Sequence, residues 1–508
     1  MTEEEKMSYQ QENSEEYIFS FPKVPYFLID DEIGEDKRAK YFNEFEKIIK
    51  LYNIYERGNK FIAEGSNADY IPSDLRYKKS SMIMNKEARF LFSNAPSFNV
   101  NIDDVSGRYT TENTIMQKYL DKVLEKTNFN GKLIKGLKDC FIGKRVAIVL
   151  NFNETSGITI TFLNSLEFVY EIDRDTDELR KFVTFYEMEG TESLSNQRWF
   201  KKVYLKQNDG VYIKEEIYSG SGKLIEEVTP ETKIKFDYIP AFIILNDGLT
   251  GDIRGVSELG GLVEYEKHFS KLANCDMDAE RKSMNPIRYT IDASQQSTAK
   301  LSTSPGSYWD LQSDGDKSLE LAAKVGTLEA QMNYSGPLKT TLERIENQMY
   351  CEVDVPNITS EQLAGVITSG KTIQALYWGL TVRCDEKMLS WAPKLRELAY
   401  AIIEGGVLYP NCVGKYTFDK IPNIPFDIIV ENNYPIPEDL IEEKNVDISE
   451  VESNIMSRKA YMKKWRNLSD EEADAELLQI EKEKNMLENS MIPYEQDMVV
   501  ETEEVEEV

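Results

Sequence analysis

The stretch IPAFIILNDGLTGDIRGVSELGGLVEYEKHFSKLANCDMDAE, residues 239–280, contains the change of pattern that decides the fold. Its first part, residues 242–247, is a short apolar run typical of a strand. After Gly255, apolar residues recur every three or four positions between charged ones, which predicts an amphipathic helix that stops near Asn285 and Pro286. The apolar side of this helix is made of Leu259, Leu262, Val263, Tyr265, Phe269, Leu272 and Ala273.

Upstream of this point the sequence favours strands. Residues 144–246 contain short runs rich in Val, Ile, Phe and Tyr, separated by turn clusters such as Gln207–Gly210, and predict a mostly antiparallel β section. Farther upstream, helical spacing predicts helices over 31–57, 112–127 and 131–140. The second of these carries one apolar face, formed by Met116, Tyr119, Leu120 and Val123.

Downstream of residue 280 the pattern is mainly helical. IRYTI at 287–291 predicts a short strand, and a Ser, Gly and Asp-rich stretch precedes a helix over 334–352. A polar connector runs to residue 370 and leads into a helix of roughly 35 residues, in which Pro393 predicts a kink. Residues 413–431 predict a brief return to strand.

The long helix and the acidic tail have recognisable internal patterns. The apolar stripe of the long helix contains Ile373, Leu376, Leu380, Met388, Trp391, Leu395, Leu398 and Ile402. In the helical tail, Ser469 and Glu472 have the spacing of a capping box, which predicts a helix start. Mixed elements without an internal repeat indicate an α+β fold.

Charge and composition exclude several classes of protein. The 508-residue chain has 60 Lys and Arg against 89 Asp and Glu, and its net charge of −29 repels phosphate, which argues against a wrapping, nonspecific DNA binder. A charged content of 29% and the lack of an 18-residue apolar run predict no membrane span. We expect no cofactor.

Cysteine and histidine usage limits the chemistry further. The five cysteines are scattered without a CxxC pair, so we expect no structural zinc and interpret each as a small buried hydrophobe. They are Cys140, Cys275, Cys351, Cys384 and Cys412. The single histidine, His268, lies in a helical stretch, and we interpret it as a surface or interface residue instead of a catalytic base.

One motif points to a different chemistry. GVITSGKT at 365–372 matches the P-loop pattern through Gly365, Gly370, Lys371 and Thr372, whose backbone amides, ammonium and hydroxyl would hold phosphates and Mg²⁺. A P-loop must follow a buried parallel strand, whereas residues 360–364 are polar and helix-prone. We therefore interpret the segment as a loop leading into a helix, and a P-loop ATPase or packaging motor is the alternative.

The order of parts resembles the portal proteins of tailed bacteriophages, the head–tail connectors, of the type found in phages of Gram-positive bacteria. Residues 239–280 are similar to that family's entry into its first stem helix. LERIENQMYCEVDVPNITSEQLAGVITSGKTIQALYWGL at 342–380 is similar to the second stem helix, the tunnel loop and the start of the long helix. NIMSRKAYMKKW at 454–465 looks like the turn between crown helices.

The resemblance implies a division of the chain into wing, stem, clip and crown, assembled as a ring around a central channel. The implied segments are a flexible acidic arm 1–16, wing 17–253, first stem helix 254–283, clip 284–330, second stem helix 331–352, tunnel loop 353–369, long kinked helix with return strands 370–431, helical crown 432–490 and a disordered acidic tail 491–508. A structural capsid or baseplate protein without a channel is a second alternative.

The resemblance also implies sites and partners. A ring of typically twelve subunits would sit at one capsid vertex of the virion after synthesis in the bacterial cytoplasm, and would pass double-stranded DNA nonspecifically. Its partners would be capsid and scaffolding proteins, terminase and head–tail adaptors, with no catalytic centre. The tunnel-loop candidates are Asp354, Asn357, Ser360, Glu361, Gln362, Val366 and Ile367. The candidates for stem packing, between or within subunits, are Leu259, Leu262, Phe269, Leu272, Leu338, Leu342, Ile345 and Met349.

Overall fold

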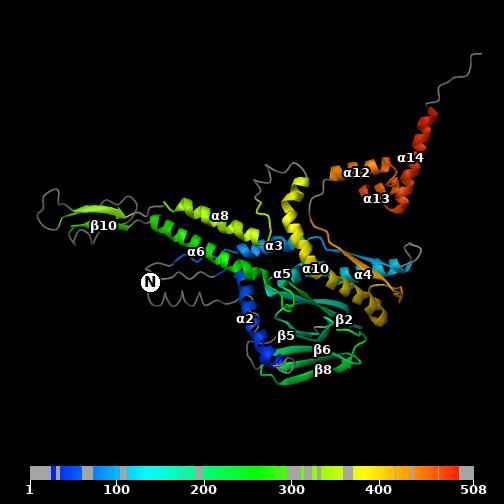
Figure 1. The fold of residues 1–508 in the computed structure, drawn as a ribbon, viewed down its shortest axis with the longest axis horizontal. Helices are drawn as coiled ribbons and strands as arrows, with labels where there is room; N and C mark the ends of the chain where they lie inside the picture. Colours follow the sequence, from blue (N-terminus) through cyan, green and yellow to red (C-terminus); the bar gives the residue numbers. More distant parts are fainter. Residues whose placement is uncertain are drawn as a thin grey trace, which may run out of the picture. The chain divides into compact units, whose positions relative to one another are not determined.

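The protein is described by a computed structural model (Figure 1). It describes residues 24–29, 35–59, 72–102, 111–173, 175–188, 197–284, 287–293, 311–313, 323–328, 333–358, 370–417, 419–435, 440–466 and 468–490. The chain divides into two compact units. The first comprises Met1–Ile358 and Tyr377–Pro435, and the second comprises Thr359–Leu376 and Ile436–Val508.

Two antiparallel sheets contain the strands of residues 144–246, which confirms the predicted antiparallel section. A three-stranded sheet has the order β3-β2-β9, with β2 (Arg145–Asn153), β3 (Gly157–Asn164) and β9 (Ala241–Leu245). A five-stranded meander follows the chain order through β4 (Phe168–Ile172), β5 (Leu179–Met188), β6 (Arg198–Gln207), β7 (Gly210–Ser219) and β8 (Leu224–Lys233).

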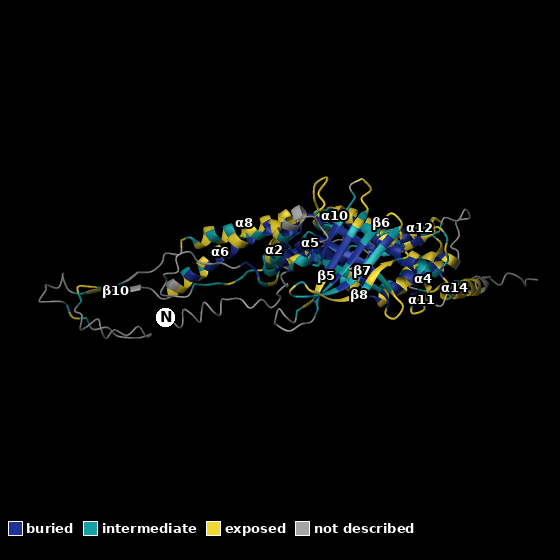
Figure 2. Cartoon of the chain, turned by 90° about the horizontal axis from the view of Figure 1, so that it is seen from below, coloured by how far each residue is buried: buried dark blue, intermediate teal, exposed yellow. Residues whose placement is uncertain are grey.

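The two sheets share one apolar core. Alternate residues of a strand point to the same face, so Ala147 and Val149 of β2 contribute together, as do Phe168 and Tyr170 of β4. Phe182 of β5 packs in the same cluster. The edge strand β8 is largely exposed, whereas β2, the central strand of the smaller sheet, is buried over its first six residues (Figure 2).

One helix packs on both β2 and β3 of the smaller sheet, and further helices pack on that helix. The helices predicted over 31–57, 112–127 and 131–140 are confirmed as α2 (Glu35–Arg57), α4 (Thr111–Lys126) and α5 (Phe129–Gly143). The apolar face predicted for α4 is fully buried at Met116, Tyr119, Leu120 and Val123. A further helix, α3 (Lys79–Phe92), was not predicted.

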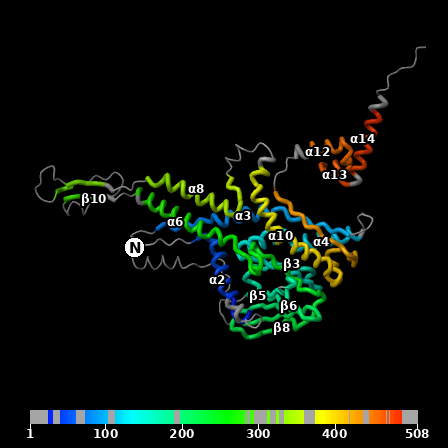
Figure 3. Tube along the Cα trace, in the orientation of Figure 1, coloured from blue at the N-terminus to red at the C-terminus, as the bar shows by residue number. Residues whose placement is uncertain are grey.

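A two-stranded sheet joins distant parts of the first unit. β1 (Ser97–Asn101) pairs antiparallel with β12 (Asp427–Glu431), and the traced chain shows how far apart in sequence these neighbours are (Figure 3). The predicted strand over 413–431 was therefore wrong for its first part. Pro410–Val413 forms the short helix α11, and the described residues from 414 to 426 contain no strand.

The described C-terminal part of the second unit consists of α12 (Leu440–Glu452), α13 (Arg458–Arg466) and α14 (Asp470–Ser490), and α13 packs on both of the others. The predicted capping box is confirmed, since the Ser469 backbone N–H donates to Glu472 at 2.9 Å and the Glu472 N–H donates to Ser469 Oγ at 3.3 Å. Trp465 Nε1 donates to Asp447 at 2.7 Å and ties α13 to α12.

Candidate functional site in two paired helices

Two long helices of the first unit lie side by side (Figure 1). They are α6 (Glu258–Met284) and α8 (Ser335–Glu352), as the sequence predicted, and at 1.5 Å per residue they extend about 40 and 27 Å. Between them in the chain, β10 (Ile287–Ile291), the predicted IRYTI strand, pairs antiparallel with β11 (Lys324–Leu328). β11 was not predicted.

The candidate stem residues divide into two groups. Leu259, Leu262, Phe269 and Met349 are already buried within a single chain, as the intrasubunit alternative describes. The other four are only partly buried in the single chain: Leu272, Leu338, Leu342 and Ile345. The first group is thus buried without contact to a neighbouring subunit. For the second group, packing between subunits stays a prediction.

A buried carboxylate on α6 caps the helix that the sequence did not predict. Glu266 accepts hydrogen bonds from the Ser80 backbone N–H at 2.8 Å, the Ser80 hydroxyl, and the Asn59 backbone N–H at 3.2 Å. Burial raises the pKa of Glu266, and these hydrogen bonds oppose the rise. Because Lys78 at the N-cap of α3 makes no side-chain cap, Glu266 supplies from another helix the acceptor that the α3 amides need.

The same face of α6 also holds the extended segment that precedes α3. Asn274 accepts the Leu75 N–H at 2.8 Å and donates to the Leu75 carbonyl at 2.9 Å. One turn farther on, Asp278 accepts the Ser73 N–H at 3.0 Å. Helix α6 is therefore fixed to the segment before α3 by hydrogen bonds between its side chains and that segment's backbone.

A buried charge network joins α3 and α6 to the long helix α10 (Gly370–Leu408). Arg383 of α10 lies 3.1 Å from Glu87 Oε1 of α3, and its Nη2 donates to Glu258 Oε1 of α6 at 2.6 Å. Lys387 Nζ donates to Glu258 Oε2 at 2.8 Å. The side chains of Lys387 and Glu258 are only 3% and 2% exposed.

The two carboxyl groups of this network differ in protonation. Burial and the adjacent Glu258 raise the pKa of Glu87 well above its ordinary value. Burial alone would raise the pKa of Glu258 too, but the hydrogen bond from Glu87 and the two cations lower it to about 2. Burial and the adjacent carboxylate thus favour the neutral form of Glu87, whereas the two cations favour the charged form of Glu258. The ion pairs of the network fix α10 against α3 and the start of α6.

The second stem helix ends in a specific turn. The Val355 N–H donates to the Tyr350 carbonyl at 3.1 Å and the Asp354 N–H to the Cys351 carbonyl at 3.4 Å, the two bonds of a Schellman motif. Asp354 occupies the left-handed position at φ 49°, and Val355 packs against the helix as a buried residue. Two of the tunnel-loop candidates are exposed: Asp354, which lies in this turn, and Asn357. The side-chain N–H of Asn357 donates to Asn347 Oδ1 at 2.9 Å. Ser360, Glu361, Gln362, Val366 and Ile367 lie outside the described residues.

The P-loop motif falls at the start of α10. Gly370, Lys371 and Thr372 form the first turn of this helix, as the loop-to-helix interpretation predicted, and Gly365 lies outside the described residues. Residues 353–358, the last described stretch before the motif, form no strand. The backbone context that a P-loop requires is absent from this described stretch.

The remaining single-residue predictions have mixed outcomes. His268 is an exposed residue of α6, as interpreted. Cys140, Cys384 and Cys412 are buried, but the prediction was wrong for Cys275 of α6 and Cys351 of α8, which are exposed. Leu376 of the long-helix stripe is also exposed. The kink at Pro393, which lies inside α10, stays a prediction.

Comparison with protein families agrees with this arrangement. The profile of the family "Phage portal protein, SPP1 Gp6-like" matches residues 34–489. The chain belongs to this family. It is a phage portal protein, and the portal family is a family of structural proteins. A search among curated proteins found no match. None of the described helices of this portal protein has the length and apolar character of a membrane span.

Proposed function

We propose that twelve copies of this portal protein close into a ring around a DNA channel at one capsid vertex. The genome is packaged and later ejected through this channel, and terminase and then head–tail adaptors dock on the ring. The observation that carries the proposal is the family match over 34–489, which includes the paired stem helices, the turn at Asp354 and the start of α10.

The segment assignments form part of this proposal. The antiparallel sheets and their helices correspond to the wing, α6 and α8 to the stem, β10 and β11 to the clip, and α12, α13 and α14 to the crown. The channel-facing residues are those of the tunnel loop: Asp354, Asn357, Ser360, Glu361, Gln362, Val366 and Ile367. The family fold supports these assignments by the order of the elements along the chain.

Exposed apolar side chains on α10 support contact between copies. Trp378, Val382 and Leu389 are 70%, 49% and 76% exposed, and their spacing of four and then seven residues places them on one face of the helix. A row of large apolar side chains in water is costly, and a second copy of the chain would cover it. We assign this face, with the partly buried stem residues Leu272, Leu338, Leu342 and Ile345, to the interface between subunits. A head-to-tail interface whose rotation closes makes a ring.

Electrostatics suit a channel that lets DNA slide. Each phosphate contact by Lys or Arg adds counterion-release affinity, which would retard a moving duplex. The chain carries a net charge of −29, and its two stem helices contain nine acidic residues against six basic ones. A wall of such subunits repels the phosphate backbone and needs no catalytic residue.

The mass of the purified protein tests the ring. A dodecamer of the 58.6 kDa chain has a mass of about 700 kDa, which native mass spectrometry or light scattering after size exclusion measures directly. We expect a single high-mass species with an integral number of subunits. A monomer at all concentrations and salt conditions contradicts the proposal.

A further inference from the structure

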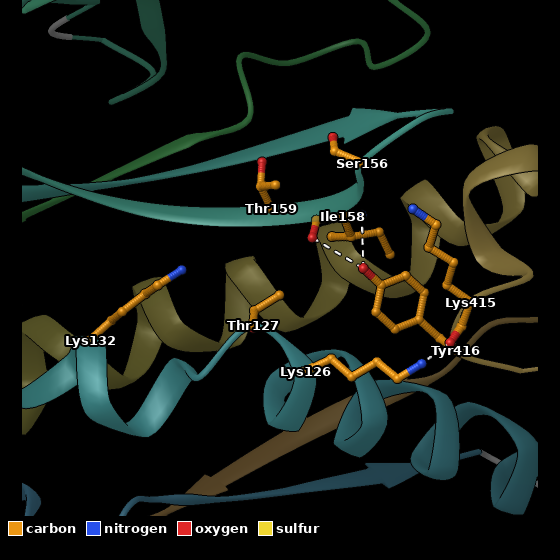
Figure 4. A pocket seen from close by; sticks show the side chains of 8 residues that line it. All are labelled: Lys126, Thr127, Lys132, Ser156, Ile158, Thr159, Lys415 and Tyr416. Carbon is orange, nitrogen blue, oxygen red and sulfur yellow. Dashed lines mark hydrogen bonds between the residues drawn. The ribbon is translucent and has the colours of Figure 1, made fainter. Parts of the chain in front are cut away.

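A pocket in the first unit, away from the stem, is lined by basic side chains from three parts of the chain (Figure 4). It has a volume of about 600 Å³. The end of α4, the first turns of α5, the β2–β3 hairpin and the turn after α11 meet around it. The lining residues are Lys126, Thr127, Lys132, Ser156, Ile158, Thr159, Lys415 and Tyr416.

The pocket is held open by a docked hairpin. The Ile158 N–H donates to Tyr416 Oη at 2.9 Å, and Tyr416 Oη donates to the Ile158 carbonyl at 3.2 Å. The hairpin turns through Gly157 at φ 86°, where a side chain would also meet Tyr416 Oη at 3.0 Å. Since these contacts fix the hairpin against the turn after α11, the pocket is formed before any ligand arrives.

The three lysines are positive charges without acidic partners. Lys126 donates to the Lys415 carbonyl, Lys132 to the Ile160 carbonyl at 2.6 Å, and Lys415 to the Thr155 carbonyl at 2.5 Å. A neutral carbonyl orients an ammonium group but does not neutralise it, and each ammonium keeps two further N–H donors. Within the described residues, none of the three forms an ion pair with a carboxylate, and no acidic residue lines the pocket.

The nearest acidic side chains in the sequence are engaged elsewhere. Glu125 pairs with Lys122 at 2.9 Å, and the pocket residue Lys126 is a smaller cause of the lowered pKa of Glu125 than Lys122 is. Glu154, in the hairpin turn, accepts a hydrogen bond from Asn411 Nδ2 at 2.9 Å. Burial lowers the pKa of Lys132, which is the expected effect on an ammonium that no carboxylate compensates. Although the chain has a net charge of −29, the lining of this pocket contains three lysines and no acidic residue.

We propose that this pocket binds a phosphate group, free or at the end of a small phosphate ester. Three ammonium groups line the pocket, and N⁺–H donors form their strongest hydrogen bonds with oxyanions such as phosphate. A pocket of this size admits a nucleotide-sized ester as well as inorganic phosphate. A dianion is favoured over a carboxylate because it offers more charge and more acceptor oxygens to three separate cations.

Isothermal titration calorimetry at constant ionic strength tests the site, with inorganic phosphate, a nucleoside monophosphate and acetate as probes. Lys126→Gln and Lys415→Gln replace exposed side chains, and Lys122→Gln on the same helix is the matched control because Lys122 is already paired with Glu125. We expect saturable phosphate binding that weakens about tenfold or more with each pocket substitution and is unchanged in the control. Stronger binding of the monophosphate identifies an ester as the ligand, and equal binding identifies free phosphate.

Three results would overturn the proposal. One is the lack of saturable phosphate binding in the millimolar range, and a second is acetate binding as tightly as phosphate. The third is unchanged affinity in a folded Lys126→Gln/Lys415→Gln double variant, with folding checked by an unaltered melting temperature. Ring formation is measured separately and does not depend on any of these outcomes.

Discussion

Replacing Lys387 with Met tests whether the buried network fixes α10 to the stem. Lys387 Nζ lies 2.8 Å from Glu258 Oε2 and 3.2 Å from Asn246 Oδ1, and its side chain is 3% exposed. Met fills a similar volume without a charge, so the substitution leaves the Glu258 carboxylate buried with Arg383 as its remaining cation. Breaking a buried pair on one side costs about 3 to 5 kcal/mol, and we expect the lower end because Arg383 stays.

Differential scanning fluorimetry and denaturant titration measure the effect. A loss of about 3 kcal/mol lowers the melting temperature of a unit of this size by about 4 °C. Lys394→Met is the matched control on the same helix, because Lys394 forms only a half-exposed pair with Glu397 at 2.9 Å and should cost less than about 1 kcal/mol. The double variant Lys387→Met/Glu258→Gln removes both charges and should recover part of the loss. Equal melting temperatures for Lys387→Met and Lys394→Met would refute the reasoning.

Single substitutions at Asp139, Asp354, Trp378 and Lys371 test other parts of the structure. Burial raises the pKa of Asp139 to about 6, so this carboxyl group binds its proton more tightly in the folded than in the unfolded state. The stability that the bound proton contributes is complete at low pH and is lost as the pH rises through 6. Asp139→Asn should therefore stabilise the protein more at pH 8 than at pH 5, and at pH 8 the free energy of unfolding should rise by up to about 3 kcal/mol. An equal rise in melting temperature at both pH values contradicts this. Asp354→Gly relieves a left-handed residue at φ 49° and should stabilise by up to about 1 kcal/mol in denaturant titration, whereas a loss of stability would show that the side chain is needed. Trp378→Glu should shift the protein from high-mass species to monomer in size-exclusion light scattering, and intact assemblies would remove this face from the interface. Lys371→Ala should leave ATP hydrolysis at the same background level as the parent protein, and turnover that disappears with the lysine would favour the P-loop alternative.

Periodic patterns made most of the fold predictable. The strands of residues 144–246 and the helices α6, α8 and α10 carry long apolar repeats, and their existence and order were read from sequence alone. The capping box at Ser469 was also predictable because all its atoms lie within four residues. Local signals of this kind do not depend on the rest of the chain.

The missed features depend on distant residues. The start of α3 has no cap from a neighbouring residue, and Glu266 of α6 provides the acceptor instead. The sequence near Ser80 therefore contains no signal for the start of this helix. The pairing of β1 with β12 and the contacts of Glu87 with α10 join segments far apart in the chain. The exposure of Cys275 likewise depends on which side of α6 faces α3, and composition gives no information about it.

Electron microscopy of the purified protein with rotational averaging tests the central claim most directly. We expect end-on views with one discrete rotational symmetry and an open centre wide enough for a DNA duplex, in a protein that does not retain DNA at physiological salt. Particles without a central opening, open filaments, or a bore lined by basic side chains that holds DNA would contradict the account.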